Sequence, residues 1–240
     1  MDAAVERLGR SADPRRVEGR LTSSVPIDTA LDLEAGRNDD IFTLSIRQGG
    51  QTLTSGGVSP LGDLPATTPW RGDDAGSPLP MSDQCLACGA LNPLGLQVTL
   101  AFDTEGVWAR LEPREAWRAS GDRLHPALAP VLLDEVAWWL GALVMKEGGL
   151  TNRLTINLYE PDAPFAVPLV ASGRFADVTP IDRKRTFWRT ESTLTTTSGH
   201  LLATASIIFR GGPDYSARQI PYFKPRTPVQ VFRRMFPNYA

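Results

Sequence analysis

The stretch HPALAPVLLDEVAWWLGALVM, residues 125–145, is the most apolar part of the chain. Its apolar side chains predict one long helix near 128–146 that packs inside the fold. Two acids, Asp134 and Glu135, stand side by side in its middle. A carboxylate in apolar surroundings is costly unless it is paired, protonated or facing water. Asp134 is therefore a candidate general base that lines a pocket, whereas we expect Glu135 to lie on a solvated edge of the helix.

Strand patterns surround this helix. Residues 95–102 and 106–112 indicate a hairpin before it, and alternating segments near 154–160, 166–178, 185–196 and 200–209 follow it. Two strands, a helix and four strands form an α+β pattern. We therefore expect an antiparallel sheet packed against the one long helix.

The flanking regions differ in composition. Residues 17–24, 41–47 and 51–58 alternate like strands, and the last two read as a hairpin across Gly49-Gly50. Residues 59–84 are rich in Pro, Gly, Ser and Asp, which is typical of a linker. The tail is rich in Pro and Arg, and we expect it on the surface, with a short helix at 229–236. The predicted units are an N-terminal strand extension, a linker, a main domain and a C-terminal tail, at 1–58, 59–84, 85–210 and 211–240.

The N-terminal strands contain an echo of the later sequence. Gly19-Arg20 and Pro26-Ile27-Asp28 reappear, with the same separation, as Gly173-Arg174 and Pro180-Ile181-Asp182. One interpretation is that residues 17–58 are a helix-less copy of the last three strands. The alternative is coincidence, and the sequence leaves both open.

Composition excludes several classes of protein. The chain has 240 residues and a net charge of −2, which does not suggest binding to nucleic acid or to a membrane surface. The N-terminus lacks an apolar signal core, and Glu135, Lys146 and Glu147 interrupt the apolar run, so we do not expect a membrane span. Cys85 and Cys88 are too few for a secreted disulfide scaffold. They also lack two further zinc ligands nearby in sequence, so we expect structural packing and no metal. A cytoplasmic enzyme or binding protein is the expectation.

Several motifs together suggest a family. CLACGALNPLGLQVTLAF (85–102), GVWARLEP (106–113), His125 with Asp134 nine residues later, and TNRLTINLYEP (151–161) resemble the hotdog-fold acyl-CoA thioesterases of the phenylacetyl-CoA (PaaI) type. The resemblance covers about residues 85–210. It implies a hotdog fold, in which an antiparallel sheet wraps around one long central helix. It also implies a homodimer or higher oligomer, with the active site between two such units.

The resemblance also implies a chemistry. Asp134 would activate water or attack the thioester, Thr151 would hold the water, and backbone N–H groups around Ala127 and Leu128 would bind the oxyanion. No cofactor is implied. Pro126 stands where the family has a glycine and lacks the N–H donor, whose loss can cost about 2.7–4 kcal/mol. Two functions therefore stay open: an acyl-CoA thioesterase, or a non-hydrolytic protein that binds acyl-CoA or an acyl carrier. A dehydratase is a more distant third.

The other candidate residues have alternative interpretations. His125 could contact substrate or act as a dehydratase-type acid–base, but we favour a structural or helix-capping role. Arg183, Lys184 and Arg185 open a predicted strand and would suit the phosphates of coenzyme A, although such a run is often only a solvated face. Trp138 could shape an acyl pocket or belong to the core.

Overall fold

A computed structural model describes residues 13–26, 28–62, 69–70, 72, 75–80 and 82–240. Its main feature is one long sheet with the strand order β2-β3-β4-β1-β10-β14-β13-β11-β7-β6-β5, and β12 pairs with β13 beside this path. Neighbouring strands are antiparallel throughout. The strands are β1 (Arg15–Leu21), β2 (Asp32–Asn38), β3 (Ile41–Gln48), β4 (Gln51–Pro60), β5 (Ser77–Pro78), β6 (Leu100–Phe102), β7 (Gly106–Leu111), β10 (Gly149–Leu158), β11 (Leu169–Arg174), β12 (Thr179–Pro180), β13 (Phe187–Thr196) and β14 (Leu201–Gly211), and a small separate pair is β8 (Arg118–Ala119) with β9 (Arg123–Leu124).

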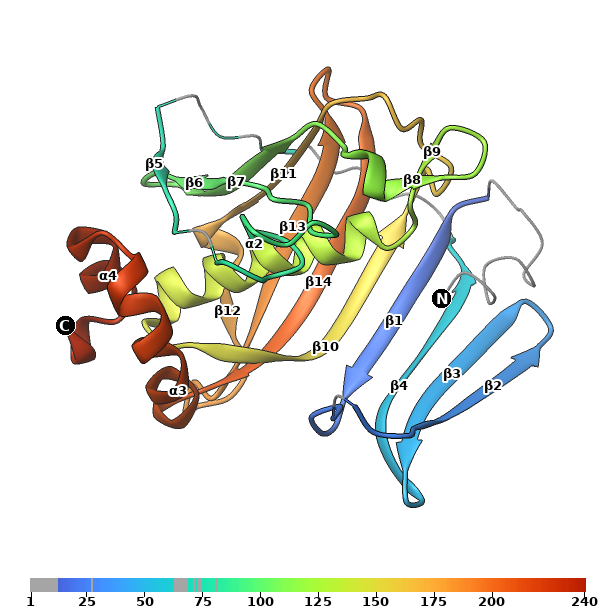
Figure 1. Ribbon diagram of the computed structural model, residues 1–240, viewed down its shortest axis with the longest axis horizontal. Coiled ribbons are helices and arrows are strands. Elements are labelled where there is room, and N and C mark those ends of the chain that lie inside the picture. Colours follow the sequence, from blue (N-terminus) through green and yellow to red (C-terminus); the bar gives the residue numbers. More distant parts are fainter. Residues whose placement is uncertain (1–12, 27, 63–68, 71, 73–74, 81) are drawn as a thin grey trace.

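Helix α2 (Leu128–Met145) lies along the inner face of this sheet, against β7, β10, β11, β13 and β14 (Figure 1). Leu132, Leu133, Val136 and Leu140 on the helix are fully buried. The predicted helix and its place inside the fold are confirmed. By length and composition α2 could cross a membrane, contrary to our expectation, but two thirds of it (67%) is buried within the protein, as in a core helix.

The N-terminal strands extend the sheet beyond β10, where β1 pairs with β10 from Arg15↔Leu158 to Arg20↔Arg153. Outward from this junction the order is β1, β4, β3, β2 on one side and β10, β14, β13, β11 on the other. Each set of four therefore has the same connectivity, in which the second strand lies farthest out and the fourth lies beside the first. Among the described residues, only the second set has a helix against it (Figure 1).

This correspondence differs from the one that the sequence echo suggested. The echo aligns Gly19 on β1 with Gly173 on β11, whereas the sheet order makes β10 the counterpart of β1. The interpretation from the sequence also left out β2. The N-terminal set therefore corresponds to the four strands β10, β11, β13 and β14, and not to the last three strands of the chain. Ile27, part of the echo, lies outside the described residues. The repeated residues therefore do not mark the structural correspondence.

Two strand predictions need correction. Strand β2 was missed because its sequence, DLEAGRN, has no apolar alternation and all seven residues are exposed. Residues 95–99 were predicted as strand, but only 100–102 belong to β6. In this region backbone hydrogen bonds go to the preceding loop, from Leu96 N–H to Leu86 O and from Val98 N–H to Ala87 O. The backbone N–H groups of this segment are therefore hydrogen bonded to a neighbouring loop and not to a strand.

The tail and part of the predicted linker belong to the packed structure. Strand β5 pairs with β6, and Leu79 is buried. The tail forms α3 (Pro213–Phe223) and α4 (Val229–Met235), which gather at the C-terminal end of α2 (Figure 1). Phe232, Met235 and Phe236 are buried in the main core. The short helix expected at 229–236 is confirmed by α4, but the expectation that the tail lies on the surface is wrong for these apolar side chains, which pack at the end of α2.

Candidate functional site

Asp134 and Thr151 meet between α2 and β10. Asp134 stands in the second turn of α2 and is half-buried, and Thr151 is near the start of β10. The Thr151 hydroxyl donates to Asp134 Oδ1 at 2.9 Å. Between Thr151 and Arg153 the register of β10 against β14 shifts by a β-bulge. Such bulges redirect side chains, so a local irregularity accompanies this contact.

Burial changes the acidity of both helix carboxyl groups. It raises the pKa of Asp134 to about 6, and the hydrogen bond from Thr151 opposes this shift. It also raises the pKa of Glu135 to about 7, and the nearby Cys85 adds to this shift. Two adjacent carboxyl groups with raised pKa values form an unusual feature in a core helix.

The predicted oxyanion donors at the start of α2 are already hydrogen bonded. The Ala127 N–H donates to His125 Nδ1 at 3.2 Å, and the Leu128 N–H donates to His125 O at 2.9 Å. The expectation that these two N–H groups are unpaired is therefore wrong in this structure. His125 satisfies them through its ring and its carbonyl group, which fits the structural role that we favoured, whereas the N-cap residue is Ala127 and no side chain caps α2.

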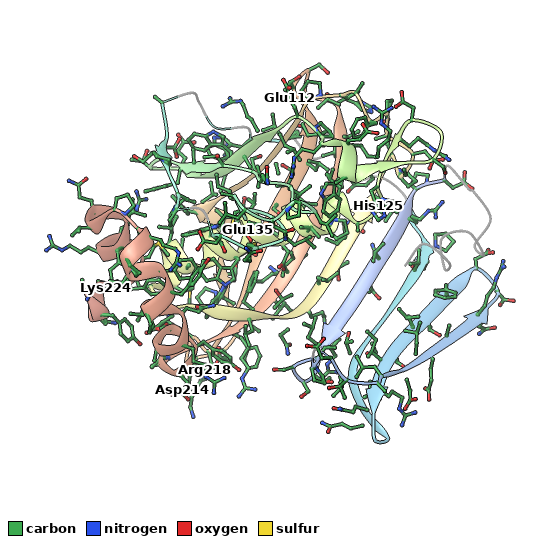
Figure 2. All side chains as sticks on the ribbon, in the orientation of Figure 1. Glu112, His125, Glu135, Asp214, Arg218 and Lys224 are labelled. Atoms are coloured by element: carbon green, nitrogen blue, oxygen red, sulfur yellow. The ribbon has the colours of Figure 1, made fainter. Side chains whose placement is uncertain are left out.

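These N–H groups are also distant from Asp134. Ala127 precedes Asp134 by seven residues, which corresponds to about 10 Å along a helix at about 1.5 Å per residue. His125 marks the start of α2, whereas Glu135, the neighbour of Asp134, lies well along it (Figure 2). One thioester carbonyl group cannot contact both places within a single helix.

The basic run lies at the other end of α2. Arg183, Lys184 and Arg185 are exposed and form a turn before β13, which begins at Phe187, so they do not open the strand as predicted. Arg185 has a left-handed backbone, with φ of 55°, and its guanidinium group contacts Met145 Sδ at 3.5 Å. The run is therefore available to a phosphate beside the C-terminal end of α2, and its role in binding coenzyme A stays a prediction.

Trp138 packs under the C-terminal helices. Its ring stacks on Phe223 of α3 with centroids 5.5 Å apart, and its indole N–H donates to Gly149 O at 2.9 Å. These contacts show that Trp138 packs against the core. A contact with an acyl chain stays a prediction.

Glu135 is not on a solvated edge as expected. It is half-buried, its Oε1 accepts from the Trp139 indole N–H at 3.2 Å, and its Oε2 lies 3.7 Å from Cys85 Sγ. The sequence motif around Cys85 and Cys88 thus lies against the central helix. Sequence reasoning missed this contact because it joins residues fifty positions apart.

Asp134 lines neither of two hollows found among the described residues. A hollow of about 30 Å³ beside His125 and Pro126 has room for only a water or two. A broad hollow of about 760 Å³ is lined by Glu18, Arg153 and Thr155, among others. Arg153 and Thr155 alternate along β10 with the core residues Leu154 and Ile156, so this hollow is on the face of the sheet away from α2.

Comparison with known proteins identifies the fold. No protein-family profile matches the sequence, and a sequence search of curated proteins finds no match. Among solved structures, acyl-CoA thioesterase II TesB2 from Mycobacterium marinum is similar, with a TM-score of 0.56, 11% identity, and 88% of this chain and 84% of that chain covered. The dehydratase domain from the CurJ module of curacin polyketide synthase has a TM-score of 0.55 and 10% identity, with 87% and 78% covered.

A third similar structure is described by its fold alone. It is a conserved protein of unknown function with a hot dog fold from Alicyclobacillus acidocaldarius, with a TM-score of 0.54, 16% identity, and 88% of this chain and 83% of that chain covered. Thioesterases and dehydratases both match at low identity, so the comparisons do not choose a reaction. Together with the sheet that wraps α2, they show that the chain has a hotdog fold.

Proposed function

We propose that the protein is an acyl-thioester hydrolase in which Asp134 acts as general base or nucleophile. The observation that carries this proposal is the 2.9 Å hydrogen bond from Thr151 to Asp134. A hydroxyl group that donates to the carboxylate keeps its own oxygen lone pairs for a water, so the pair can hold and activate one water molecule. Asp134 would take a proton from this water. The resulting hydroxide would attack the thioester carbon, the C–S bond would break, and the thiolate would leave as the thiol with the proton that Asp134 had taken.

Acyl-CoA is the substrate class that we propose. The exposed Arg183-Lys184-Arg185 turn at the far end of α2 supports it, because cationic side chains suit the phosphates of coenzyme A. The thioesterase among the similar structures makes this chemistry plausible for the fold, whereas the dehydratase shows that the fold alone does not decide it.

A second candidate function is non-hydrolytic binding of an acyl thioester. The observation that favours it is the internal hydrogen bonding of the Ala127 and Leu128 N–H groups, next to Pro126, which has no N–H. Without an oxyanion donor, a carboxylate and a water lose a large part of their rate advantage.

The experiment is thiol release from a panel of short, long and aromatic acyl-CoAs. We expect turnover by the wild type and a loss of about 10²–10⁴-fold in kcat for Asp134→Asn, the range for a missing general base. Thr151→Val should lose about tenfold or more, because a hydrogen bond to a charged group is removed. Thr155→Val is the matched control, since Thr155 is on the same strand and lines the hollow on the other face.

The outcomes separate the two functions. If the wild type turns over no acyl-CoA but binds one in equilibrium dialysis, the hydrolase proposal fails and the binding function replaces it. If the wild type hydrolyses acyl-CoA and Asp134→Asn is equally active, another group is the base.

A further inference from the structure

Cys85, Cys88 and Glu135 form a cluster that the proposed hydrolysis does not use. One ligand atom of each lies within 4.8 Å of the other two, and Cys85 Sγ is 3.7 Å from Glu135 Oε2. Cys88 is buried, and the other two residues are half-buried. The cluster joins the loop between β5 and β6 to the middle of the central helix.

The loop between the cysteines has a conformation that suits metal binding. The Ala87 N–H donates to Cys85 Sγ at 3.3 Å, so a backbone amide already points at this sulfur. The chain then turns back, and the Gly89 N–H donates to Cys85 O at 3.0 Å. A Cβ at Gly89 would lie 2.2 Å from Cys85 O, so only glycine fits this turn. Amide donors of this kind stabilise a thiolate, which is the form of cysteine that binds a metal.

Glu135 is a half-buried acid that has no basic neighbour among the described residues. Within the part of the chain that the structure describes, its polar contacts are with the two cysteines, Trp139 and Asp134. An anionic carboxylate there adds to the negative charge of any thiolate beside it. A divalent cation would neutralise this charge, and Trp139 could keep its hydrogen bond to Oε1 while Oε2 binds the metal.

The spacing of the three groups fits one ion. In a tetrahedral zinc site, Zn–S bonds of about 2.3 Å and Zn–O bonds of about 2.0–2.2 Å separate the ligand atoms by about 3.5–3.8 Å. Cys85 Sγ lies 3.7 Å from Glu135 Oε2, and the three ligand atoms all lie within 4.8 Å of one another. These separations need little adjustment to bind one zinc ion.

We propose that Cys85, Cys88 and Glu135 bind a zinc ion and thereby fasten the loop at 82–97 to helix α2. Two thiolates and one carboxylate leave the fourth position for water. Sequence reasoning set zinc aside because no further ligand stood near the cysteines. The fold supplies the third ligand from the helix, beside Asp134. The proposal does not depend on the proposed hydrolysis.

The test measures metal content directly. The 240-residue protein is purified under reducing conditions, dialysed against zinc and desalted. We expect inductively coupled plasma mass spectrometry to find about one zinc ion per chain. After removal by a chelator, cobalt(II) should give the near-ultraviolet absorption of thiolate-to-cobalt charge transfer. Glu135→Gln, which is nearly isosteric, should weaken cobalt binding at least tenfold, and Cys85→Ser should abolish the charge-transfer band. Asp134→Asn is the matched control, because it changes the adjacent acid and should keep the metal.

Three results would overturn the proposal. The first is a desalted wild type that holds no zinc and shows no cobalt–thiolate band. The second is a chain two mass units lighter under reducing conditions, which would mean a stable Cys85–Cys88 disulfide. The third is unchanged cobalt affinity in a Glu135→Gln variant with wild-type circular dichroism. If that variant does not fold, the intensity of the cobalt band in the wild type still decides whether two thiolates bind the metal.

Discussion

The two sets of four strands have the same connectivity but very different interiors. On β10, β11 and β14, core residues such as Ile156, Leu169 and Ile207 are fully buried against α2. On β3 the corresponding inward residues Phe42 and Leu44 are only half-buried. Strand β2 is exposed along its whole length. Among residues 13–62 as described, Leu53 is the one large apolar side chain that is buried.

The difference shows what the helix contributes to a hotdog sheet. A sheet face becomes a core only when another layer covers it. The main core extends across the junction as far as Val17, which pairs with the buried Ile156 on β10 and packs against the core. We infer that the N-terminal strands owe their stability mainly to pairing with β10, and four predictions test this.

The largest effect is expected from core truncation. Leu132→Ala on α2 removes a fully buried side chain and should cost about 2–5 kcal/mol of unfolding free energy. Leu44→Ala in β3 should cost about 1 kcal/mol or less, since its side chain is partly exposed already. Urea titrations of both variants measure the difference. Equal costs would mean that the N-terminal sheet has a core comparable to that of the helix-covered half.

Amide hydrogen exchange should differ between the halves in the intact protein. We expect amides in the pairing of β2 with β3 to exchange about 100-fold faster or more than amides in the pairing of β13 with β14. The reason is that β2 is an uncovered edge strand, whereas β13 and β14 lie under α2. Exchange followed by mass spectrometry of peptides gives both rates, and uniform protection would contradict the comparison.

A glycine substitution in the helix-covered half should cost about 1–3 kcal/mol of unfolding free energy. In α2 a Cβ at Gly141 would lie 2.3 Å from the Trp188 indole nitrogen, and Trp188 is buried. Gly141→Ala should therefore overpack the core. At Gly62, outside the strands, a Cβ would meet no described atom within 4 Å, so Gly62→Ala is the control and should stay within about 0.5 kcal/mol of the wild type. A neutral Gly141→Ala in thermal unfolding would mean that Trp188 can move aside.

The smallest effect concerns the ion pair between β2 and β3. Arg47 donates to Glu34 at 3.0 Å, and both side chains are partly exposed. Glu34→Gln should change stability by about 0.5 kcal/mol or less, because water and salt screen such pairs. A larger loss in the same urea titration would show that this ion pair contributes more to the pairing of β2 with β3 than an exposed pair should.

The local sequence predicted the elements that carry a periodic signal. The apolar run placed the helix at 128–146, and it spans 128–145; the Gly49-Gly50 turn correctly joined β3 to β4. Strand β2 had no such signal, because a strand exposed on both faces needs no alternation. The buried face of α4 was also missed, since its partner is the distant end of α2.

Part of the candidate site could be predicted from the sequence, and part depends on the tertiary structure. The sequence and its resemblance suggested Asp134 and Thr151 together, and their hydrogen bond supports the pairing, while its catalytic role stays a prediction. The chain by itself determined a long apolar helix with two acids, flanked by strands. Only the tertiary structure decided that Glu135 faces Cys85 and Cys88, that His125 occupies the helix-start N–H groups, and that β1 covers the edge of β10. Periodicity follows from the geometry of one element, whereas these contacts depend on how separate elements pack.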